Sequence, residues 1–216
     1  MSREEFLHRV RAAVAEGNRA GGAAVRPERG GVGYQGAGDD PVARLRAELT
    51  AAGGRLHEAR DAGEALRLVR RVVAEKDARR VLVGDGELLD SMDLETALAG
   101  IEVVRVRALE AVGERAAFFA ADVGVSGVDH VIAETGTLVL ATRRDQPRSL
   151  SLLPPVHVAV VRRDQLLGDL FDLFGDSPLP SCLSLITGPS KTGDIELKLV
   201  TGVHGPGEVH LVLITG

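Results

Sequence analysis

The chain has 216 residues, of which 44% are hydrophobic and 26% charged, a composition typical of a globular protein that buries a full core. Its net charge of −5 and aromatic content of 3% provide neither the basic stripe nor the stacking rings that nucleic-acid binding uses. It has no apolar run that could cross a membrane, no signal peptide and a single cysteine, Cys182, so we expect a cytoplasmic protein without a metal site.

The N-terminal residues predict a helix over residues 2–16. Ser2 and Glu5 have the spacing of a capping box, and Phe6, Val10 and Val14 then recur on one helical face. A glycine-rich stretch over residues 20–40 follows, and its composition predicts a flexible loop. We therefore expect an N-terminal helix and loop over residues 1–38 and an α/β domain over residues 39–216.

Helices and strands alternate through the first half of that domain. In chain order the patterns predict a helix from Pro41 capped by Asp40, a strand over 54–60, a helix from Asp61 through Val73, a strand over 80–84, a helix over 90–98, a strand over 101–106 and a helix over 109–121. Strands separated by helices of this length favour a parallel sheet with helices on both faces.

The second half has strand-like segments joined by short turns, over residues 122–127, 129–136, 137–142 and 157–163. Short turns imply antiparallel neighbours. Asp164 then predicts the start of a helix over 165–174 that ends at Gly175, and strands over 181–187 and 208–215 follow. The predicted fold class is α/β: a mixed, mainly parallel sheet flanked by helices, with an extra N-terminal helix.

The sequence AETGT contains the first group that could carry chemistry. Glu134 lies between an apolar strand and the turn Thr135-Gly136-Thr137. Burial among Val, Ile and Leu would raise the pKa of its carboxyl group and suit it to act as an acid, base or nucleophile. The alternative is a plain hairpin turn, in which Glu134 faces solvent and the threonines bond to backbone groups.

The second group lies in the sequence GPSKTGDIE, over residues 188–196. Ser190 or Thr192 could cap a short helical turn, whose free N–H groups bind anions with help from Lys191. The residue before Lys191 is not glycine, so the segment is no Walker loop, and a capped turn without ligand is the alternative. The candidate ligand-binding residues of this segment are Gly188, Pro189, Ser190, Lys191, Thr192, Asp194 and Glu196.

The third group lies in the sequence GVHGP, where His204 and Gly205 precede the last strand. A loop histidine beside a carboxylate could transfer protons, whereas one histidine alone does not make a metal site. Arg148 adds a cation for a carboxylate or phosphate. All three groups follow strands, where an α/β sheet collects its ligand site, and we expect Glu134, Lys191 and His204 to converge on one cleft.

Taken in order, AETGTLVLAT, RSLSLLPPVHVAVV and ITGPSKTGDIELKLVTGVHGP resemble the LUD-domain family, in particular its lactate utilization protein C (LutC, or YkgG-like) branch. The resemblance implies a fold of the NagB/RpiA/CoA-transferase-like type. It also implies a subunit of an iron–sulfur system that oxidises L-lactate to pyruvate, in which partner subunits carry the clusters and this chain binds none. Gly193 stands where the family usually has alanine, and this glycine favours a looser turn.

Two alternatives remain open beside this resemblance. The chain could be a stand-alone enzyme of the sugar-phosphate isomerase, CoA-transferase or folate cyclo-ligase type, with Glu134 as base or nucleophile and residues 188–192 holding a phosphate. It could also be a non-catalytic interaction or regulatory module. Whether the chain is itself catalytic, with Glu134 and His204 as the catalytic pair, is therefore an open question at this point.

Overall fold

The computed structural model describes residues 1–20, 28, 35–109, 114–174, 180–195 and 198–216. The chain divides into two compact units, Met1–Tyr34 and Gln35–Gly216. Most of the glycine-rich stretch over 20–40 lies outside the described residues, so its predicted flexibility stays a prediction.

The first unit contains helix α1 (Arg3–Ala20). The predicted capping box is present: the backbone N–H of Ser2 donates to Glu5 at 2.7 Å, and that of Glu5 donates to the Ser2 hydroxyl at 3.2 Å. The helix runs four residues beyond the predicted end at residue 16. Its apolar residues Phe6, Val10 and Val14 are exposed.

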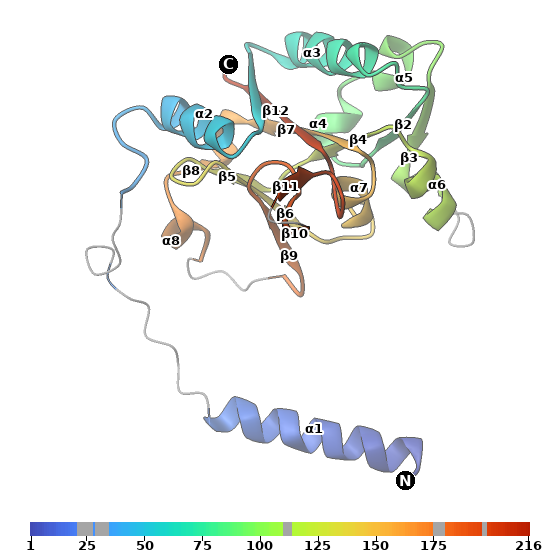
Figure 1. Cartoon of the computed structure of the whole chain (residues 1–216), viewed down its shortest axis with the longest axis vertical. Coiled ribbons are helices and arrows are strands. Elements are labelled where there is room, and N and C mark those ends of the chain that lie inside the picture. Colours follow the sequence, from blue (N-terminus) through green and yellow to red (C-terminus); the bar gives the residue numbers. More distant parts are fainter. Residues whose placement is uncertain (21–27, 29–34, 110–113, 175–179, 196–197) are drawn as a thin grey trace. The chain divides into compact units, whose positions relative to one another are not determined.

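A six-stranded parallel sheet forms the centre of the second unit (Figure 1). In spatial order its strands are β1 (Arg55–Ala59), β12 (Glu208–Ile214), β7 (Val156–Arg162), β4 (Val123–Gly127), β2 (Arg80–Val83) and β3 (Glu102–Arg105). Every neighbouring pair is parallel. Both faces are covered, and the inner strands β12, β7, β4 and β2 are accordingly mostly apolar and buried. The predicted fold class is confirmed.

Helices α3 (Ala62–Glu75), α4 (Glu87–Asp90) and α5 (Leu94–Ala97) pack on one face of this sheet. Helix α2 (Pro41–Ala51), α6 (Glu114–Ala120) and α7 (Ser149–Leu152) pack on the other. Asp40 caps α2 as predicted, since its carboxylate accepts from Val42 N at 3.1 Å. The helix predicted over 90–98 is shorter in the structure: α4 ends at Asp90, and Asp93 caps a new turn, so that only α5 lies within the predicted range.

The antiparallel neighbours predicted for the second half lie in a sheet of their own. It has the order β8 (Leu166–Leu167), β5 (His130–Ile132), β6 (Thr137–Ala141) and β9 (Leu183–Ile186), with β5–β6 and β6–β9 antiparallel. A separate antiparallel hairpin joins β10 (Lys191–Ile195) to β11 (Lys198–Thr201).

The helix predicted over 165–174 is wrong. A single 3₁₀ turn, Arg163–Gln165, leads into β8, where Leu166 and Leu167 pair with β5. Helix α8 (Leu170–Leu173) starts later, since Asp169 caps it by accepting from Asp172 N at 3.0 Å. Pairing with a sheet edge outweighs the helical pattern here. The helix predicted over 109–121 is shorter, beginning at Glu114 after a 3₁₀ turn at Val106–Ala108, with residues 110–113 outside the described part.

Candidate functional site

The first two sequence motifs meet at the C-terminal end of α2. Gly136 has φ +66°, and a Cβ added there would lie 2.4 Å from the backbone nitrogen of Leu49. Gly188 has φ +76°, and a Cβ added there would lie 2.7 Å from the carbonyl oxygen of Ala52. Both turns therefore need glycine for their backbone conformation and for their close approach to the same helix.

Three threonine hydroxyls connect these two turns. Thr137 Oγ1 lies 2.7 Å from Thr135 Oγ1 and 2.6 Å from Thr187 Oγ1, and Thr137 is buried. Thr135 and Thr137 thus form a hydrogen bond with each other, whereas the plain-turn interpretation predicted hydrogen bonds to backbone groups. This chain of hydroxyls fixes the residues before Gly188 against the AETGT turn.

The third motif joins the second through backbone hydrogen bonds. Ser190 N donates to Pro206 O at 2.9 Å, and Gly202 N donates to Ser190 O at 3.0 Å. Gly205 is close to the same serine, because a Cβ added to it would lie 3.1 Å from Ser190 Cβ. The fold therefore brings the three motifs together, although residues 136 and 205 are far apart in the sequence.

The charged side chains of these motifs have separate partners. Glu134 Oε1 accepts from the backbone nitrogens of Gln35 and Gly36, at 3.0 and 3.1 Å. Lys191 Nζ donates to the carbonyl of Ala52 at the end of α2, and His204 is exposed. In the described part of the chain, no hydrogen bond or ion pair joins Glu134, Lys191 and His204. Their convergence on one cleft stays a prediction.

The helical turn predicted after Ser190 is wrong. Residues 191–195 form strand β10, in which Lys191 pairs with Thr201 and Thr192 with Val200. A β-branched residue and an available partner strand favour the extended conformation. Asp194 belongs to this strand, and Glu196 lies outside the described residues.

The two remaining predicted residues flank this cluster. Pro189 is buried, and a Cβ added to Gly53 would lie 3.7 Å from its ring and 3.5 Å from Lys191 Nζ. Arg148 is exposed at the start of α7, whose last residue, Leu152, presents its carbonyl oxygen toward Gly205. Arg148 therefore belongs to the helix that borders the third motif.

A second site, which the sequence analysis missed, lies at the carboxyl ends of β2, β4 and β7. It is a cleft of about 280 Å³, lined by residues that include Asp85, Gly86, Gly127, His130, Gln146 and Arg162. Ligands of open α/β sheets bind at this edge, where connections leave neighbouring strands toward opposite faces. The sequence signals were the turns VGDGE after β2 and SGVDH after β4.

Among the described residues, three buried polar atoms of residues that line this cleft have no hydrogen-bond partner: His130 Nδ1, Gln146 Nε2 and Asp85 Oδ1, the last of which is ion-paired with Arg107 Nη1 at 3.2 Å. The residues Asp85 and Gln146 are only 7% and 4% exposed. Such an atom costs about 1–3 kcal/mol when its hydrogen bond is missing, so its presence needs a reason. Burial raises the pKa of the Asp85 carboxyl group, against the lowering effect of the Arg107 backbone N–H.

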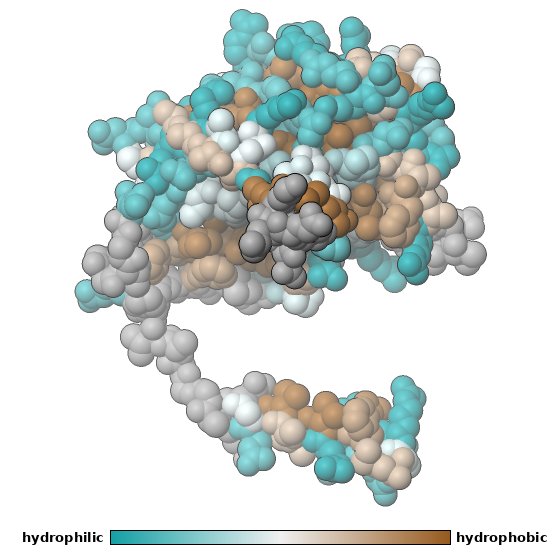
Figure 2. Space-filling model, viewed as in Figure 1, coloured by the Kyte–Doolittle hydropathy of each residue, from teal (hydrophilic) through white to brown (hydrophobic). Residues whose placement is uncertain are grey.

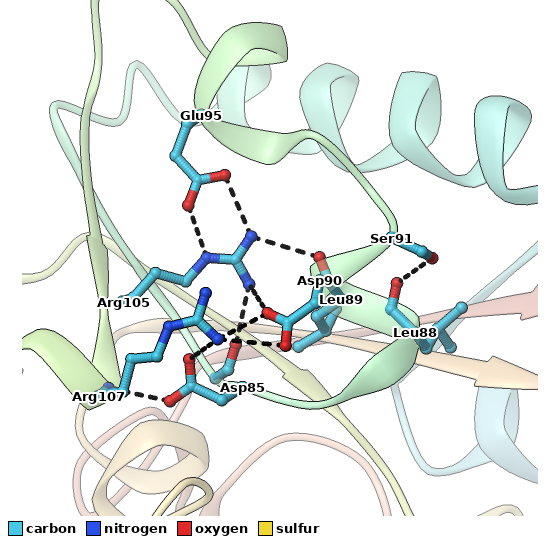
Figure 3. A network of polar contacts seen from close by, with 9 residues as sticks. Asp85, Leu88, Leu89, Asp90, Ser91, Glu95, Arg105 and Arg107 are labelled. Atoms are coloured by element: carbon cyan, nitrogen blue, oxygen red, sulfur yellow. Dashed lines mark hydrogen bonds and ion pairs between the residues drawn. The ribbon is translucent and has the colours of Figure 1, made fainter.

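Two arginines fix the wall of the cleft formed by residues 84–90 (Figure 3). Arg105 donates to Glu95 through Nε at 2.6 Å and Nη2 at 3.1 Å, and to Asp90 through Nη1 at 3.1 Å. Arg107 donates to Asp90 Oδ1 at 3.0 Å, and its backbone N–H donates to Asp85 Oδ2 at 2.9 Å. The loop after β2 is thereby fixed to the end of β3 before any ligand binds.

The described residues contain neither a metal-binding cluster nor a membrane-spanning helix. None of them forms a group of three or more His, Cys, Asp or Glu side chains that could hold a metal ion. Of the helices that the structure describes, none has the length and apolar character to span a bilayer.

Most of this chain matches a known protein family. The model of the LUD domain matches residues 42–214. "Lactate utilization protein C" of Halalkalibacterium halodurans is 32% identical over 136 residues, 58% of each chain, and that of Shouchella clausii is 41% identical over 84 residues, 36% of this chain and 37% of its own. The matches thus span less than two thirds of those relatives.

A solved structure is similar in fold. The crystal structure of a duf162 family protein from Deinococcus radiodurans has a TM-score of 0.56 and 23% sequence identity, and covers 82% of this chain and 96% of its own. At this identity the similarity supports the α/β fold alone.

Proposed function

Because this chain belongs to the LUD-domain family, whose model matches residues 42–214, we propose that it is a cytoplasmic subunit of a bacterial lactate utilization system that oxidises L-lactate to pyruvate. The observation that carries the proposal is the similarity, over up to 136 residues, to relatives named lactate utilization protein C. The AETGT, GPSKT and GVHGP motifs on which the sequence resemblance rests also pack together around Ser190 and the end of α2.

In this proposal the electrons pass through iron–sulfur clusters of partner subunits. Clusters are held by several cysteine thiolates, and this chain has a single cysteine, Cys182. Its own part is to bind a small anionic ligand at the joined motifs. There Ser190, Lys191 and Thr192 supply hydroxyl and ammonium donors, and Glu134 and His204 are the proposed proton-transfer groups.

The β10–β11 hairpin is the surface that we propose for contact with these partners. Leu199 is 67% exposed and Val203, just after the hairpin, is 44% exposed. In Figure 2 apolar residues, in brown, lie at this hairpin, and other brown and tan residues lie elsewhere on the same face. Exposed apolar groups of this kind favour protein association, and the hairpin also carries Lys191.

Growth on L-lactate tests the proposal. We expect deletion of the gene to abolish growth on L-lactate as sole carbon source but not on pyruvate, and the wild-type chain to restore it. Glu134→Gln and Lys191→Ala should restore growth poorly while the protein accumulates normally. Normal growth of the deletion strain on L-lactate would disprove the function, whereas full growth with both variants would disprove only the motif site.

Affinity purification tests the partners. The tagged chain should copurify iron–sulfur proteins, detected by their visible absorbance and iron content, and Leu199→Ser with Val203→Ser should reduce this recovery. Phe119→Ser is the matched control, because Phe119 is 62% exposed on α6 and outside the hairpin. Equal recovery with the hairpin and control variants would exclude the hairpin as the contact.

A further inference from the structure

We propose that the free edge of strand β9 is a self-association surface, on which β9 of a second copy of this chain pairs antiparallel about a two-fold axis. The contact joins the small four-stranded sheets of the two copies into one continuous sheet. The proposal does not rest on the lactate function, and it uses a different strand from the hairpin proposed to contact iron–sulfur proteins.

Strand β9 is the last strand of its sheet, next to β6 (Figure 1). It pairs with β6 over its whole length, from Leu183 opposite Ala141 to Ile186 opposite Leu138. Within the described part of the chain, no strand pairs with the other side of β9. That side is therefore an open sheet edge.

The backbone groups of Leu183 and Leu185 face this open edge. In an antiparallel pair, successive residues direct their N–H and C=O groups alternately toward the neighbouring strand and away from it. Thr142 N donates to Cys182 O at 3.0 Å, and these two residues continue the register of the pair. The alternation then directs the groups of Ser184 toward β6, and those of Leu183 and Leu185 toward the open edge.

The edge of β9 lacks the devices that usually protect an edge strand, which are charged side chains, proline and bulges. The edge strands of the main sheet have charged residues: β1 contains Arg55 and Glu58, and β3 contains Glu102 and Arg105. Strand β9 has the sequence LSLI and an uninterrupted register with β6. Residues 177–190 include no charged residue at all. An edge of this kind favours pairing with another strand.

Strand β9 is complementary to itself. An antiparallel pair centred on Ser184 places Leu183 of each copy opposite Leu185 of the other. Both leucines direct their backbone groups outward, so each outward N–H of one copy meets an outward C=O of the other. The same short segment thus supplies both halves of the contact.

The side chains of β9 favour a second copy over a charged peptide. Leu185 is 46% exposed, and Leu183 lies on the same face of the strand because side chains alternate. Pairing covers each Leu185 with Leu183 of the other copy. Since residues 177–190 carry no charge, self-pairing brings no like charges together, and a charged peptide would gain no ion pair there.

Sedimentation of the purified full-length chain tests the association. At about 100 µM we expect a species of twice the chain mass of 22.8 kDa, which dissociates on dilution. Leu185→Lys should weaken this dimer at least about tenfold, because an edge lysine opposes strand pairing. Leu199→Lys is the matched control, since Leu199 is 67% exposed on β11 and outside β9.

Two results of this experiment would contradict the proposal. A chain that stays monomeric at about 100 µM has no self-association of the expected strength. A dimer that the Leu185 and Leu199 variants affect equally, or that neither affects, does not use the β9 edge.

Cysteine cross-linking tests the register. In a pair centred on Ser184, the two Ser184 residues face each other without hydrogen bonds, with Cα atoms about 4.5 Å apart, within the range of a disulfide. Ser184→Cys, combined with Cys182→Ser to remove the native thiol, should therefore give a disulfide-linked dimer on mild oxidation. Ser181→Cys in the same background is the control: Ser181 is more exposed than Ser184, but the pairing separates its two copies by roughly 20 Å.

Equal cross-linking of the two cysteine variants, or none of the Ser184 variant, would overturn the proposed pairing even if the Leu185 variant fails to fold. Growth on L-lactate is a separate measurement, so either proposal can fail alone.

Discussion

The imidazole rings of His57 and His210 lie edge to edge in nearly parallel planes, with centroids 5.3 Å apart and planes 2° from parallel. His57 Nε2 lies 3.0 Å from His210 Nδ1, so one ring donates and the other accepts. Glu208 Oε2 lies 3.3 Å from the other nitrogen of His210. Burial lowers the pKa of His210 to about 4, and it also lowers the pKa of His57. The surroundings of the pair therefore favour the neutral form of both rings.

We expect the protein to lose stability as the pH falls from about 6.5 toward 4. His157 is fully buried against Ser126 at 2.8 Å, and burial lowers its pKa to about 4 as well. Between the pKa of about 4 in the folded chain and the ordinary value of 6.5 in the unfolded chain, the unfolded chain binds more protons than the folded one. Each such histidine can therefore reduce the free energy of unfolding by up to about 1.4 kcal/mol per pH unit. Urea unfolding across this pH range measures the slope.

A variant that replaces one histidine shows whether that histidine causes this change of the free energy of unfolding with pH. His157→Gln should lower the number of protons taken up on unfolding by up to about one. A His157 variant with the wild-type slope would contradict the assignment, whatever its stability at neutral pH.

Gly136→Ala should lower the free energy of unfolding by about 2–4 kcal/mol. The new Cβ would meet the backbone of Leu49 at 2.4 Å, and φ of +66° disfavours any side chain. Gly193→Ala is the matched control, since a Cβ there meets nothing within 4 Å, and we expect a change within about 0.5 kcal/mol. Chemical denaturation measures the free energy of unfolding of both variants. Equal effects would contradict the close approach of Gly136 to α2.

Thr137→Val should destabilise the domain by about 1–3 kcal/mol. The change keeps the shape but leaves the hydroxyls of Thr135 and Thr187 without their shared partner. Thr201→Val, on the exposed face of β11, should change the stability by less than about 0.5 kcal/mol. Thermal unfolding compares the two, and a neutral Thr137 variant would mean that the hydroxyl chain contributes nothing.

Glu95→Gln should destabilise the protein fully above about pH 4.5 and progressively less as the pH falls toward 2. Hydrogen bonds from Arg105 lower the pKa of the Glu95 carboxyl group to about 2, so this carboxylate contributes stability at neutral pH that is lost as the pH falls toward 2. Because Glu95 is half exposed, we expect at most about 1 kcal/mol at neutral pH. The stability difference from wild type should close in acid, and a pH-independent difference would contradict the ion pair.

The local patterns of the sequence predicted most elements of the fold. The capping box of Ser2 and Glu5, the cap at Asp40 and the apolar strand runs depend on neighbours in the sequence, and all appear in the structure. Two of the errors have a common cause: residues 165–174 and 190–196 have helix-like patterns, but Leu166 and Lys191 pair with other strands. Such pairing depends on partners that local patterns do not reveal.

By itself, the sequence determined the α/β class, the N-terminal helix and the family resemblance, because helix caps, periodicity and motifs are encoded locally. Only the tertiary structure decided which groups meet. It placed Gly136 and Gly188 against one helix, and it gave Glu134 the N–H groups of residues 35 and 36 as partners. It also formed the cleft of Asp85 and Gln146, since strands far apart in the chain end at one edge only once the sheet is assembled.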